Sequence, residues 1–309
     1  MKVLICDPIS QDILDALEST ANLEIDLIQD LNEEGLVAVI PSYNAIVVRG
    51  RTTVTGKVIE AASGLELIVR GGVGLDNVDL EAAKAKGITV ANTPGMNSES
   101  VAELAIGFLL CLARQIPRAH AGLAAGRWEK KQFRGHEING KTLGIIGMGR
   151  IGRAISQKAA ALGMSVVGFD PYVDDREMNK YGAKAVILDK LRRHSDFITI
   201  HVPINEETRN LVDADFLAGA KDGVYIINCA RGGVVDEVAL LDALKSGKVT
   251  GAALDVFTDE PPGPSPLFEH ERVIGTPHIG AATFEAQERV GKEIVRILTE
   301  KAAVPTEVE

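Results

Sequence analysis

Cysteine is scarce in this chain of 309 residues. Only Cys6, Cys111 and Cys229 occur, and no two of them have the CxxC spacing. An odd and scattered set argues against a disulfide framework and against a structural zinc site. The sequence therefore predicts reduced thiols in a cytoplasmic protein that holds no metal.

Basic runs and long apolar runs are also missing. The net charge is −10, which disfavours nucleic acid and anionic membrane surfaces as partners. The longest apolar stretch, Val101–Ala113, carries Glu103 and is too short to span a bilayer. At the N-terminus a short apolar run is followed at once by Asp7, which is typical of a strand and not of a signal peptide.

Short β-rich runs alternate with helix-like segments along the chain, whose length suits two domains of roughly 100–200 residues. In the first third, helices are predicted at Gln11–Glu18 and Leu80–Lys86. The strands predicted around them are Lys2–Cys6, Leu23–Ile28, Ala45–Val48, Leu65–Val69 and Ile88–Ala91. Short strands with helices between them are typical of a parallel sheet.

A second α/β series follows a break at Pro94-Gly95. A helix is predicted to begin near Ser100, which has capping-box spacing to Glu103, and to end at about Gln115, before a polar stretch. The later strands, mostly apolar throughout as in sheets covered on both faces, are Thr142–Ile146, Ser165–Phe169, Phe197–His201, Val224–Asn228, Gly251–Val256 and Val273–Thr276. A last helix, Phe284–Thr299, precedes a tail, AAVPTEVE, that is predicted to be exposed and partly disordered.

The segment LGIIGMGRIGRAI carries the clearest local signal, because a predicted strand leads directly into Gly147-x-Gly149-x-x-Gly152 and then into a predicted helix. Gly147 permits a tight turn, Gly149 lets the backbone approach a pyrophosphate, and Gly152 lets helix and strand pack closely. The free N–H groups of the helix start favour phosphate. Arg150 and Ile151 are expected to lie over the pyrophosphate, although Arg150 also suits an ordinary surface position.

An acidic residue at the end of the next strand indicates which dinucleotide is bound. Asp170 lies 18 residues after Gly152. A carboxylate there accepts hydrogen bonds from the adenosine ribose and repels a 2′-phosphate, which favours NAD over NADP. The alternative is a structural glycine turn with Asp170 as a strand-end cap, but strand, glycines, helix and acid all follow in the order that a cofactor site needs.

Three later segments each end an apolar run with a reactive residue, namely Arg231 in NCARGG, Glu260 in DVFTDEP and His278 in TPHIG. In a doubly wound sheet the carboxyl ends of the strands converge on one crevice beside the dinucleotide, so we expect the three side chains to meet. Each has an ordinary alternative when taken alone: a surface ion pair, a solvated carboxylate or a core histidine. Their occurrence together after a cofactor motif favours a catalytic set.

The three side chains suit the oxidation of a secondary alcohol, which loses a hydride and a proton. His278 is the expected base. Glu260 is expected to orient the imidazole and to stabilise the imidazolium. Arg231 is expected to hold a substrate carboxylate and to polarise the C2 oxygen.

Other strand-end residues are expected to line the cofactor pocket. His201, followed by Val202 and Pro203, belongs to this group and is not expected to act as a second base, and Asp255 is expected near the nicotinamide. The full predicted cofactor set is Gly147, Gly149, Arg150, Ile151, Gly152, Asp170, His201, Val202, Pro203, Cys229, Ala230, Asp255, His278 and Gly280.

Several motifs together resemble one known family. The glycine motif and the segments Asn228–Glu237, Ala253–Pro262 and Thr276–Thr283 are similar to those of the D-2-hydroxyacid dehydrogenases. Two further segments, Val69–Ser98 and Cys111–Pro117, most resemble the branch that oxidises 3-phosphoglycerate in the first step of serine biosynthesis. The resemblance covers nearly the whole chain and implies for the Arg–Glu–His set the roles argued above.

The resemblance implies an α/β fold with two Rossmann-like or flavodoxin-like parallel-sheet domains separated by a cleft. Residues 1–95 with 283–309 form the expected substrate-binding domain, and residues 96–282 form the expected NAD-binding Rossmann domain. A homodimer or tetramer built by the cofactor domains is implied, with an arm around Trp128 reaching across. Because longer relatives carry C-terminal domains that bind serine and this chain stops at residue 309, feedback inhibition through such a domain is not expected.

The first domain is expected to select the substrate. Arg49 and Arg70 each end a predicted strand, and two guanidiniums suit a substrate phosphate, assisted by Lys130 or Lys131 of a second subunit. The alternative for both arginines is a surface position. With the contacts that the resemblance implies at the carboxylate, the predicted substrate set is Arg49, Arg70, Gly71, Gly72, Val73, Asn97, Arg231 and His278.

Two other functions stay open. A hydroxypyruvate or glyoxylate reductase belongs to the same family and needs no phosphate site. Corepressors of the same fold keep the Arg–Glu–His set while they sense NADH and bind peptides, and the segments Val69–Ser98 and Cys111–Pro117 disfavour that function.

Overall fold

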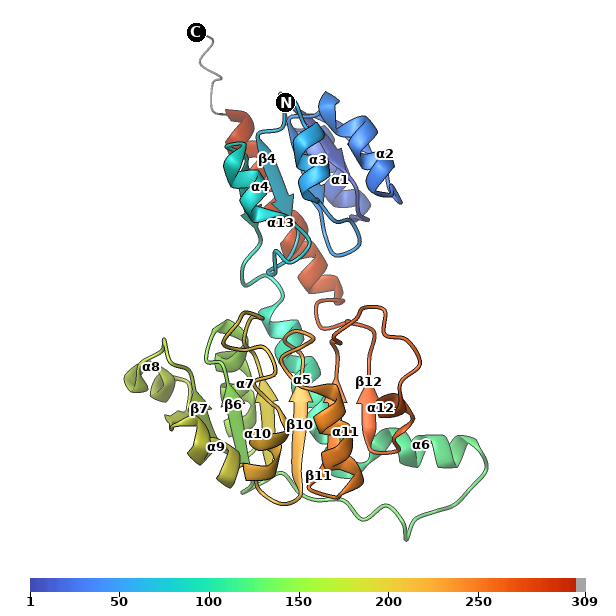
Figure 1. The fold of residues 1–309 in the computed structure, drawn as a ribbon, viewed down its shortest axis with the longest axis vertical. Helices are drawn as coiled ribbons and strands as arrows, with labels where there is room; N and C mark the ends of the chain where they lie inside the picture. The colour runs from blue at the N-terminus through green and yellow to red at the C-terminus, as the bar shows by residue number, and fades with distance from the viewer. Residues whose placement is uncertain (304–309) are drawn as a thin grey trace. The chain divides into compact units, whose positions relative to one another are not determined.

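The computed structural model describes residues 1–303, which form two compact units. Unit 1 consists of Met1–Asn97 and the segment that begins at Ala282, and unit 2 consists of Ser98–Ala281. Each unit is built on one parallel sheet, which confirms the predicted α/β class (Figure 1). The tail predicted to be disordered lies outside the described residues, except for Ala302 and Ala303.

Unit 1 has a five-stranded sheet in the order β2-β1-β3-β4-β5, which is the order of flavodoxin-like folds. All neighbouring strands are parallel. The strands are β1 Lys2–Ile5, β2 Glu24–Leu27, β3 Ala45–Val48, β4 Leu67–Arg70 and β5 Thr89–Asn92. The helices are α1 Gln11–Glu18, α2 Glu33–Val39, α3 Gly56–Ala61, α4 Leu80–Ala85 and α13 Phe284–Ala303, with a 3-10 turn, η1, at Ile40–Ser42.

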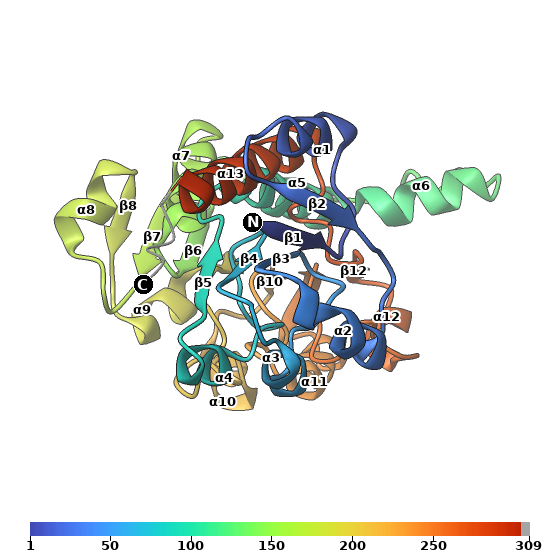
Figure 2. The same cartoon turned by 90° about the horizontal axis from the view of Figure 1, so that it is seen from above.

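Helices cover both faces of this sheet, which is why β3 is apolar at every position and β1 and β4 are apolar except at Lys2 and Arg70. Val3 and Ile5 of β1 pack on the face covered by α1 and α13, where Ile294 is buried. Leu4 points to the opposite face, which α2, α3 and α4 cover, and packs in the cluster that contains Ile59 (Figure 2). The alternation follows from the two-residue period of a strand.

Unit 2 has a seven-stranded parallel sheet in the order β12-β11-β10-β9-β6-β7-β8. Its strands are β6 Thr142–Ile146, β7 Ser165–Phe169, β8 Ala183–Ala185, β9 Phe197–Ile200, β10 Val224–Asn228, β11 Val249–Leu254 and β12 Val273–Gly275. Its helices are α5 Ser98–Arg114, α6 Ile116–Ala124, α7 Arg150–Ala161, α8 Asp175–Lys180, α9 Leu188–His194, α10 Ala214–Gly219, α11 Glu237–Lys245 and α12 Pro266–Glu269.

The strand order of unit 2 reverses at β6. The chain adds β7 and β8 on one side of β6, and β9 to β12 on the other. Helices α5 and α7 pack on one face of the sheet, and α9, α10 and α11 pack on the other. In open α/β sheets, ligands bind outside the carboxyl ends of the strands at such a reversal, so the ends of β6 and β9 mark the expected place.

Several predicted bounds were wrong by a few residues. The strand predicted at Leu65–Val69 is Leu67–Arg70, and the helix predicted from Ser100 begins at Ser98. The polar stretch after Gln115 begins with a second helix, α6, which has Pro117 in its first turn. A proline is tolerated there because the first N–H groups of a helix have no intrahelical partner.

No single helix within residues 1–303 has the length and apolarity to cross a membrane. Helices α5 and α6 have the necessary length and apolarity only when they are taken together, and the pair is bent by 65°. Val101, Leu109 and Leu112 of α5 are buried in the core of unit 2.

Candidate active site

The predicted catalytic residues follow three neighbouring strands. Strand β10 pairs with β11, and β11 pairs with β12, all in parallel. Arg231 lies in the loop after β10, Glu260 in the loop after β11, and His278 in the loop after β12. The structure therefore places all three at the carboxyl edge of the unit 2 sheet.

Glu260 and His278 are in direct contact. The Oε2 atom of Glu260 lies 2.7 Å from Nδ1 of His278, while Oε1 accepts a hydrogen bond of 3.1 Å from the N–H of Phe257. In the tautomer that donates from Nδ1 to this carboxylate, the neutral imidazole has its lone pair on Nε2. The His278 side chain is 49% exposed, which leaves Nε2 room to accept a proton from a bound molecule.

Asp255 fixes the loop that carries His278. One carboxylate oxygen accepts from the hydroxyl of Thr276 at 2.5 Å and from the N–H of Ile279 at 2.8 Å, and the other accepts from the N–H of Gly280 at 2.8 Å. Asp255 is 1% exposed, and His278 has a left-handed φ of 52°. A non-glycine residue is uncommon there, so the flanking bonds help to hold it. The sequence argument missed this role, which sets Asp255 apart from a residue that only lines the nicotinamide.

The loop that carries Arg231 is fixed by Asn228 at the end of β10. The Asn228 amide donates to the carbonyl of Arg231 at 3.0 Å, and its side-chain oxygen accepts from the N–H of Ala230 at 3.0 Å. The guanidinium of Arg231 donates to the carbonyl of Ala230 at 2.7 Å. These bonds hold the backbone on both sides of Arg231, the residue that is predicted to hold the substrate carboxylate.

The three glycines of the motif have different surroundings. A Cβ on Gly147, whose φ is 96°, would lie 2.3 Å from the carbonyl oxygen of His201, and one on Gly152 would lie 2.1 Å from that of Gly147. A Cβ on Gly149 would meet nothing within 4 Å. Packing therefore requires two of the glycines, whereas the space beside Gly149 is open as a pyrophosphate needs.

Asp170 is bonded to the glycine loop. One carboxylate oxygen accepts from the N–H of Met148 at 2.8 Å, and the other accepts from the N–H of Tyr172 at 2.9 Å. Each oxygen retains a lone-pair site for a ribose hydroxyl. Helix α7 begins beside it with Gly149 as the N-cap, and within the described chain no side chain caps these N–H groups. Arg150 is exposed and Ile151 is half-buried at this helix start. Loop, helix start and acid together fit a dinucleotide.

His201 is a neutral imidazole in this fold. Burial lowers its pKa to about 3, and its Nε2 lies 2.7 Å from the hydroxyl of Thr199. A histidine that stays neutral above pH 3 gains no proton in the physiological range. Val202 is half-buried beside it, and Pro203 is exposed.

Two residues of the predicted cofactor set are almost fully buried. Cys229 and Ala230 are 6% and 7% exposed, and burial raises the pKa of the Cys229 thiol. Little of either residue is therefore available to touch a cofactor. In residues 1–303, no three His, Cys, Asp or Glu side chains are grouped closely enough to hold a metal ion.

The two arginines predicted to bind phosphate end adjacent strands of unit 1. Arg70 is paired with Val48 in the register of β3 and β4, so Arg49 follows directly beside it. The carboxylate of Asp7, at the end of β1, accepts a hydrogen bond from the backbone N–H of Arg49. The Arg49 guanidinium donates to the carbonyl of Pro8 at 3.2 Å, and burial lowers its pKa. Asp7 and Arg49 lie where the strand order of unit 1 reverses, between β1 and β3.

The loop after Arg70 needs its glycines. A Cβ on Gly72 would lie 1.4 Å from Nη1 of Arg70, so the guanidinium rests against the bare backbone. A Cβ on Gly71 would meet Ile294 at 3.0 Å. Val73 is 38% exposed. The side-chain oxygen of Asn97 is buried and accepts no hydrogen bond from residues 1–303.

Comparison with known proteins decides the family. Residues 106–280 match the model of the D-isomer specific 2-hydroxyacid dehydrogenase, NAD binding domain. The chain belongs to this dehydrogenase family. The family predicted from the motifs is therefore confirmed, and the glycine motif lies in its NAD-binding domain.

Relatives within the dehydrogenase family differ in length and name. A D-3-phosphoglycerate dehydrogenase of Pongo abelii is 48% identical over 95% of this chain and 55% of its own length. The chain thus spans about half the length of the phosphoglycerate dehydrogenases that it matches. A hydroxypyruvate reductase of Thermotoga maritima is 45% identical over 95% of this chain and 96% of its own. The structure of an NAD-dependent formate dehydrogenase from Staphylococcus aureus in complex with NAD superposes with a TM-score of 0.87, at 32% identity, covering 98% of this chain and 96% of that one.

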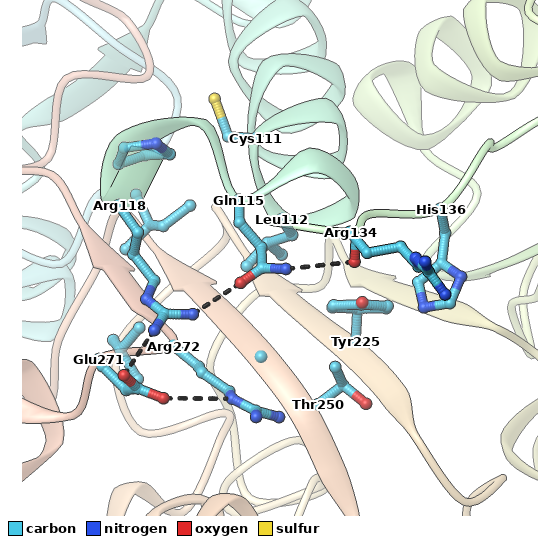
Figure 3. Close-up of a pocket in the computed structure, with 14 residues that line it drawn as sticks. Cys111, Leu112, Gln115, Arg118, Arg134, His136, Tyr225, Thr250, Glu271 and Arg272 are labelled. Atoms are coloured by element: carbon cyan, nitrogen blue, oxygen red, sulfur yellow. Dashed lines mark hydrogen bonds and ion pairs between the residues drawn. The ribbon is translucent and has the colours of Figure 1, made fainter. Parts of the chain in front are cut away.

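Unit 2 also contains a cavity of about 250 Å³ away from the loops of Arg231, Glu260 and His278. Tyr225, Gly251 and Ile274 line it near the amino ends of β10, β11 and β12. Arg118 spans its side by donating to Gln115 and to Glu271, each at 2.6 Å (Figure 3). None of the predicted site residues lines this cavity.

Proposed function

We propose that this chain oxidises 3-phospho-D-glycerate to 3-phosphohydroxypyruvate with NAD, as the first step of serine biosynthesis in the cytoplasm. The observation that carries the proposal is the 2.7 Å contact between Glu260 and His278, at the strand edge that also carries Arg231. The relatives named D-3-phosphoglycerate dehydrogenase support the choice of substrate.

The catalytic residues divide the work of alcohol oxidation. NAD, when bound, accepts the hydride from C2. His278 takes the proton of the C2 hydroxyl at Nε2, and Glu260 stabilises the imidazolium that forms. Arg231 holds the substrate carboxylate and polarises the C2 oxygen through its planar donors.

The cofactor is held by loops of unit 2 in this proposal. The open backbone at Gly149 and the N–H groups at the start of α7 bind the pyrophosphate. Asp170 accepts from the adenosine ribose, and His201 with Val202 and Pro203 lines the neighbouring wall. Asp255 contributes beside the nicotinamide by holding the loop of His278 through its bonds to Thr276, Ile279 and Gly280.

The substrate contacts of unit 1 are proposed on the residues at the ends of β3 and β4. Arg49 and Arg70 bind the phosphate as paired guanidiniums. The loop from Gly71 to Val73 and the amide of Asn97 bind the carboxylate. The buried side-chain oxygen of Asn97 needs a hydrogen-bond donor, because a buried acceptor without one is costly. A substrate hydroxyl can supply that donor, whereas the carboxylate can only accept from the amide nitrogen.

The assay for this proposal is NADH formation, followed by absorbance, from purified chain, NAD and 3-phosphoglycerate. We expect turnover with 3-phosphoglycerate and a much lower kcat/KM with D-glycerate and D-lactate. Absence of turnover with every 2-hydroxy acid, while NADH still binds, would contradict the proposal and favour a binding protein of the corepressor kind.

A hydroxypyruvate reductase is the second candidate. It is favoured by the Thermotoga maritima relative, since the chain covers 96% of that protein. The same assay run in reverse, with NADH and hydroxypyruvate against 3-phosphohydroxypyruvate, separates the two. A higher kcat/KM for the unphosphorylated acid would support the reductase.

We also propose that unit 2 forms a homodimer. Sedimentation decides whether two such dimers pair into a tetramer. Helix α6 projects from the rest of unit 2 (Figure 2). Leu123 at its end is 59% exposed, and Trp128 on the arm that follows is 82% exposed. Large exposed apolar side chains on a projecting segment suit a subunit contact. Sedimentation of the wild type and of Trp128→Ala tests this, and a monomeric wild type would refute it.

A further inference from the structure

Two acidic residues stand at the start of α11, and they face different partners. Asp236 is the N-cap, and its carboxylate accepts from the N–H groups of Val238 at 2.9 Å and Ala239 at 3.0 Å. Glu237 instead reaches the loop after β11. Its Oε1 accepts from the N–H of Thr258 at 2.8 Å and from the Thr258 hydroxyl at 2.9 Å. Since Asp236 already caps the helix, the Glu237 carboxylate is committed to the loop.

That loop carries Glu260. Thr258 follows Phe257, whose N–H donates to one oxygen of Glu260 at 3.1 Å, and the other oxygen contacts His278 at 2.7 Å. Hydrogen bonds therefore run from Glu237 to the imidazole through one short turn of the chain. The proposed mechanism gives Glu237 no other role.

The two ends of this connection differ in how firmly they are held. Helix α11 is anchored in the core by Leu240, which is fully buried, and by Leu244. The loop is buried as far as Phe257 and exposed from Thr258 to Glu260. Little apolar packing fixes its outer part, so the bonds to Glu237 supply a large share of its restraint.

We infer that Glu237 is a positioning residue for the Glu260–His278 pair and acts through Thr258. The inference rests on the proposed function, because it concerns the orientation of the proposed base. A base must lie within hydrogen-bond reach of the proton that it removes, so a small displacement of Glu260 lowers the rate of the chemical step and leaves cofactor binding intact.

The test compares Glu237→Ala with Glu237→Gln. Both hydrogen bonds end on the same oxygen, and a glutamine carbonyl accepts two hydrogen bonds, so Glu237→Gln keeps them and Glu237→Ala removes them. Thr258→Val is a second variant, which removes the hydroxyl contact alone. Asp215→Ala is the matched control, because Asp215 is an exposed acid in the first turn of α10 on the same unit.

We expect kcat to fall by about 10- to 100-fold in Glu237→Ala and by a smaller factor in Thr258→Val, with the Kd for NADH unchanged. Glu237→Gln and Asp215→Ala should keep the wild-type kcat. The proton NMR signal of the His278 ring, assigned with His278→Gln, should move at fixed pH in Glu237→Ala and stay in place in Glu237→Gln.

An unchanged kcat in Glu237→Ala, or an equal loss in Glu237→Gln, overturns the inference while the proposed function stands. A wild type that turns over no 2-hydroxy acid overturns the proposed function instead. In that case the NMR signal of His278 tests the positioning role without turnover. A signal that does not move in Glu237→Ala overturns this role, and a signal that moves supports it.

Discussion

The backbone of Gly232 lies directly against the carbonyl group of Phe257. A Cβ on Gly232 would be 1.7 Å from that oxygen and 2.1 Å from its carbon. The loop that carries Arg231 and the loop that carries Glu260 therefore approach so closely that any side chain on Gly232 would overlap the Phe257 carbonyl, and only glycine permits the contact.

We expect Gly232→Ala to separate the two loops. Overpacking of this kind costs about 1–3 kcal/mol or more, and kcat should fall by at least about tenfold because two catalytic residues shift. Gly263→Ala is the control, since a Cβ there would meet nothing within 4 Å. Thermal unfolding and NADH formation are the measurements. A Gly232→Ala protein with the stability and kcat of Gly263→Ala would show that the loops tolerate separation.

Removal of the proposed base should affect the chemical step more than binding. General-base catalysis contributes about 10²- to 10⁴-fold, so His278→Ala should lower kcat within that range. Glu260→Gln keeps the shape of the side chain but loses the charge that stabilises the imidazolium, and we expect a smaller loss of kcat. Both variants should keep the wild-type Kd for NADH. Wild-type turnover by His278→Ala would assign the base elsewhere.

The placement of Arg231, Glu260 and His278 at one sheet edge was predictable, because each follows a continuous apolar run and parallel strands end together. The glycine motif was predictable for a similar reason, since strand, turn and helix are adjacent in sequence. Sequence periodicity says which residues end a strand. It therefore places whole loops correctly.

The contacts between those loops were not predictable in the same way. Asp255 reaches Ile279 and Gly280, and Glu237 reaches Thr258, through atoms whose approach depends on the path of each loop. No periodic pattern records that path. A buried acid at the end of an apolar strand was a usable signal for Asp255, because a buried carboxylate needs donors.

His201 should make the stability of the fold depend on pH. Its pKa is about 3 in the folded chain against 6.5 as the ordinary value, so between these pH values the unfolded chain binds more protons. The free energy of unfolding should therefore fall as pH drops below 6.5, by up to about 1.4 kcal/mol per pH unit from this residue. Above pH 6.5 its contribution is constant.

Urea denaturation of the wild type and of His201→Asn at several pH values measures this slope. The variant has no group that titrates at this position, so its stability should decrease less steeply from pH 6.5 to pH 5. Parallel curves for the two proteins would mean that folding does not change the pKa of His201.

The arginines of unit 1 should select phosphorylated substrates. A hydrogen bond to a charged group contributes about 1.5–3 kcal/mol, so Arg49→Ala and Arg70→Ala should each lower kcat/KM for 3-phosphoglycerate by about 10- to 100-fold. The kcat/KM for D-glycerate should change little in both variants. Asp7 bonds the backbone of Arg49, and that contact survives in Arg49→Ala. Arg51→Ala is the matched control, because Arg51 pairs with Asp30 at 2.5 Å and is 66% exposed. Equal losses for both substrates would point to general damage and not to a phosphate site.

Asp170 should determine the choice between NAD and NADP. Its carboxylate repels the 2′-phosphate of NADP. Removal of this one negative charge should therefore reduce the preference for NAD over NADP by about tenfold or more. Asp170→Asn retains one acceptor for the N–H of Met148, so the glycine loop should keep its path. Asp175→Asn is the control, since Asp175 is an exposed acid on the helix that follows the same strand. The measurement is the ratio of kcat/KM with NAD to kcat/KM with NADP. If this ratio changes equally in both variants, the change reflects the net charge of the surface. Asp170 would then have no role at the ribose.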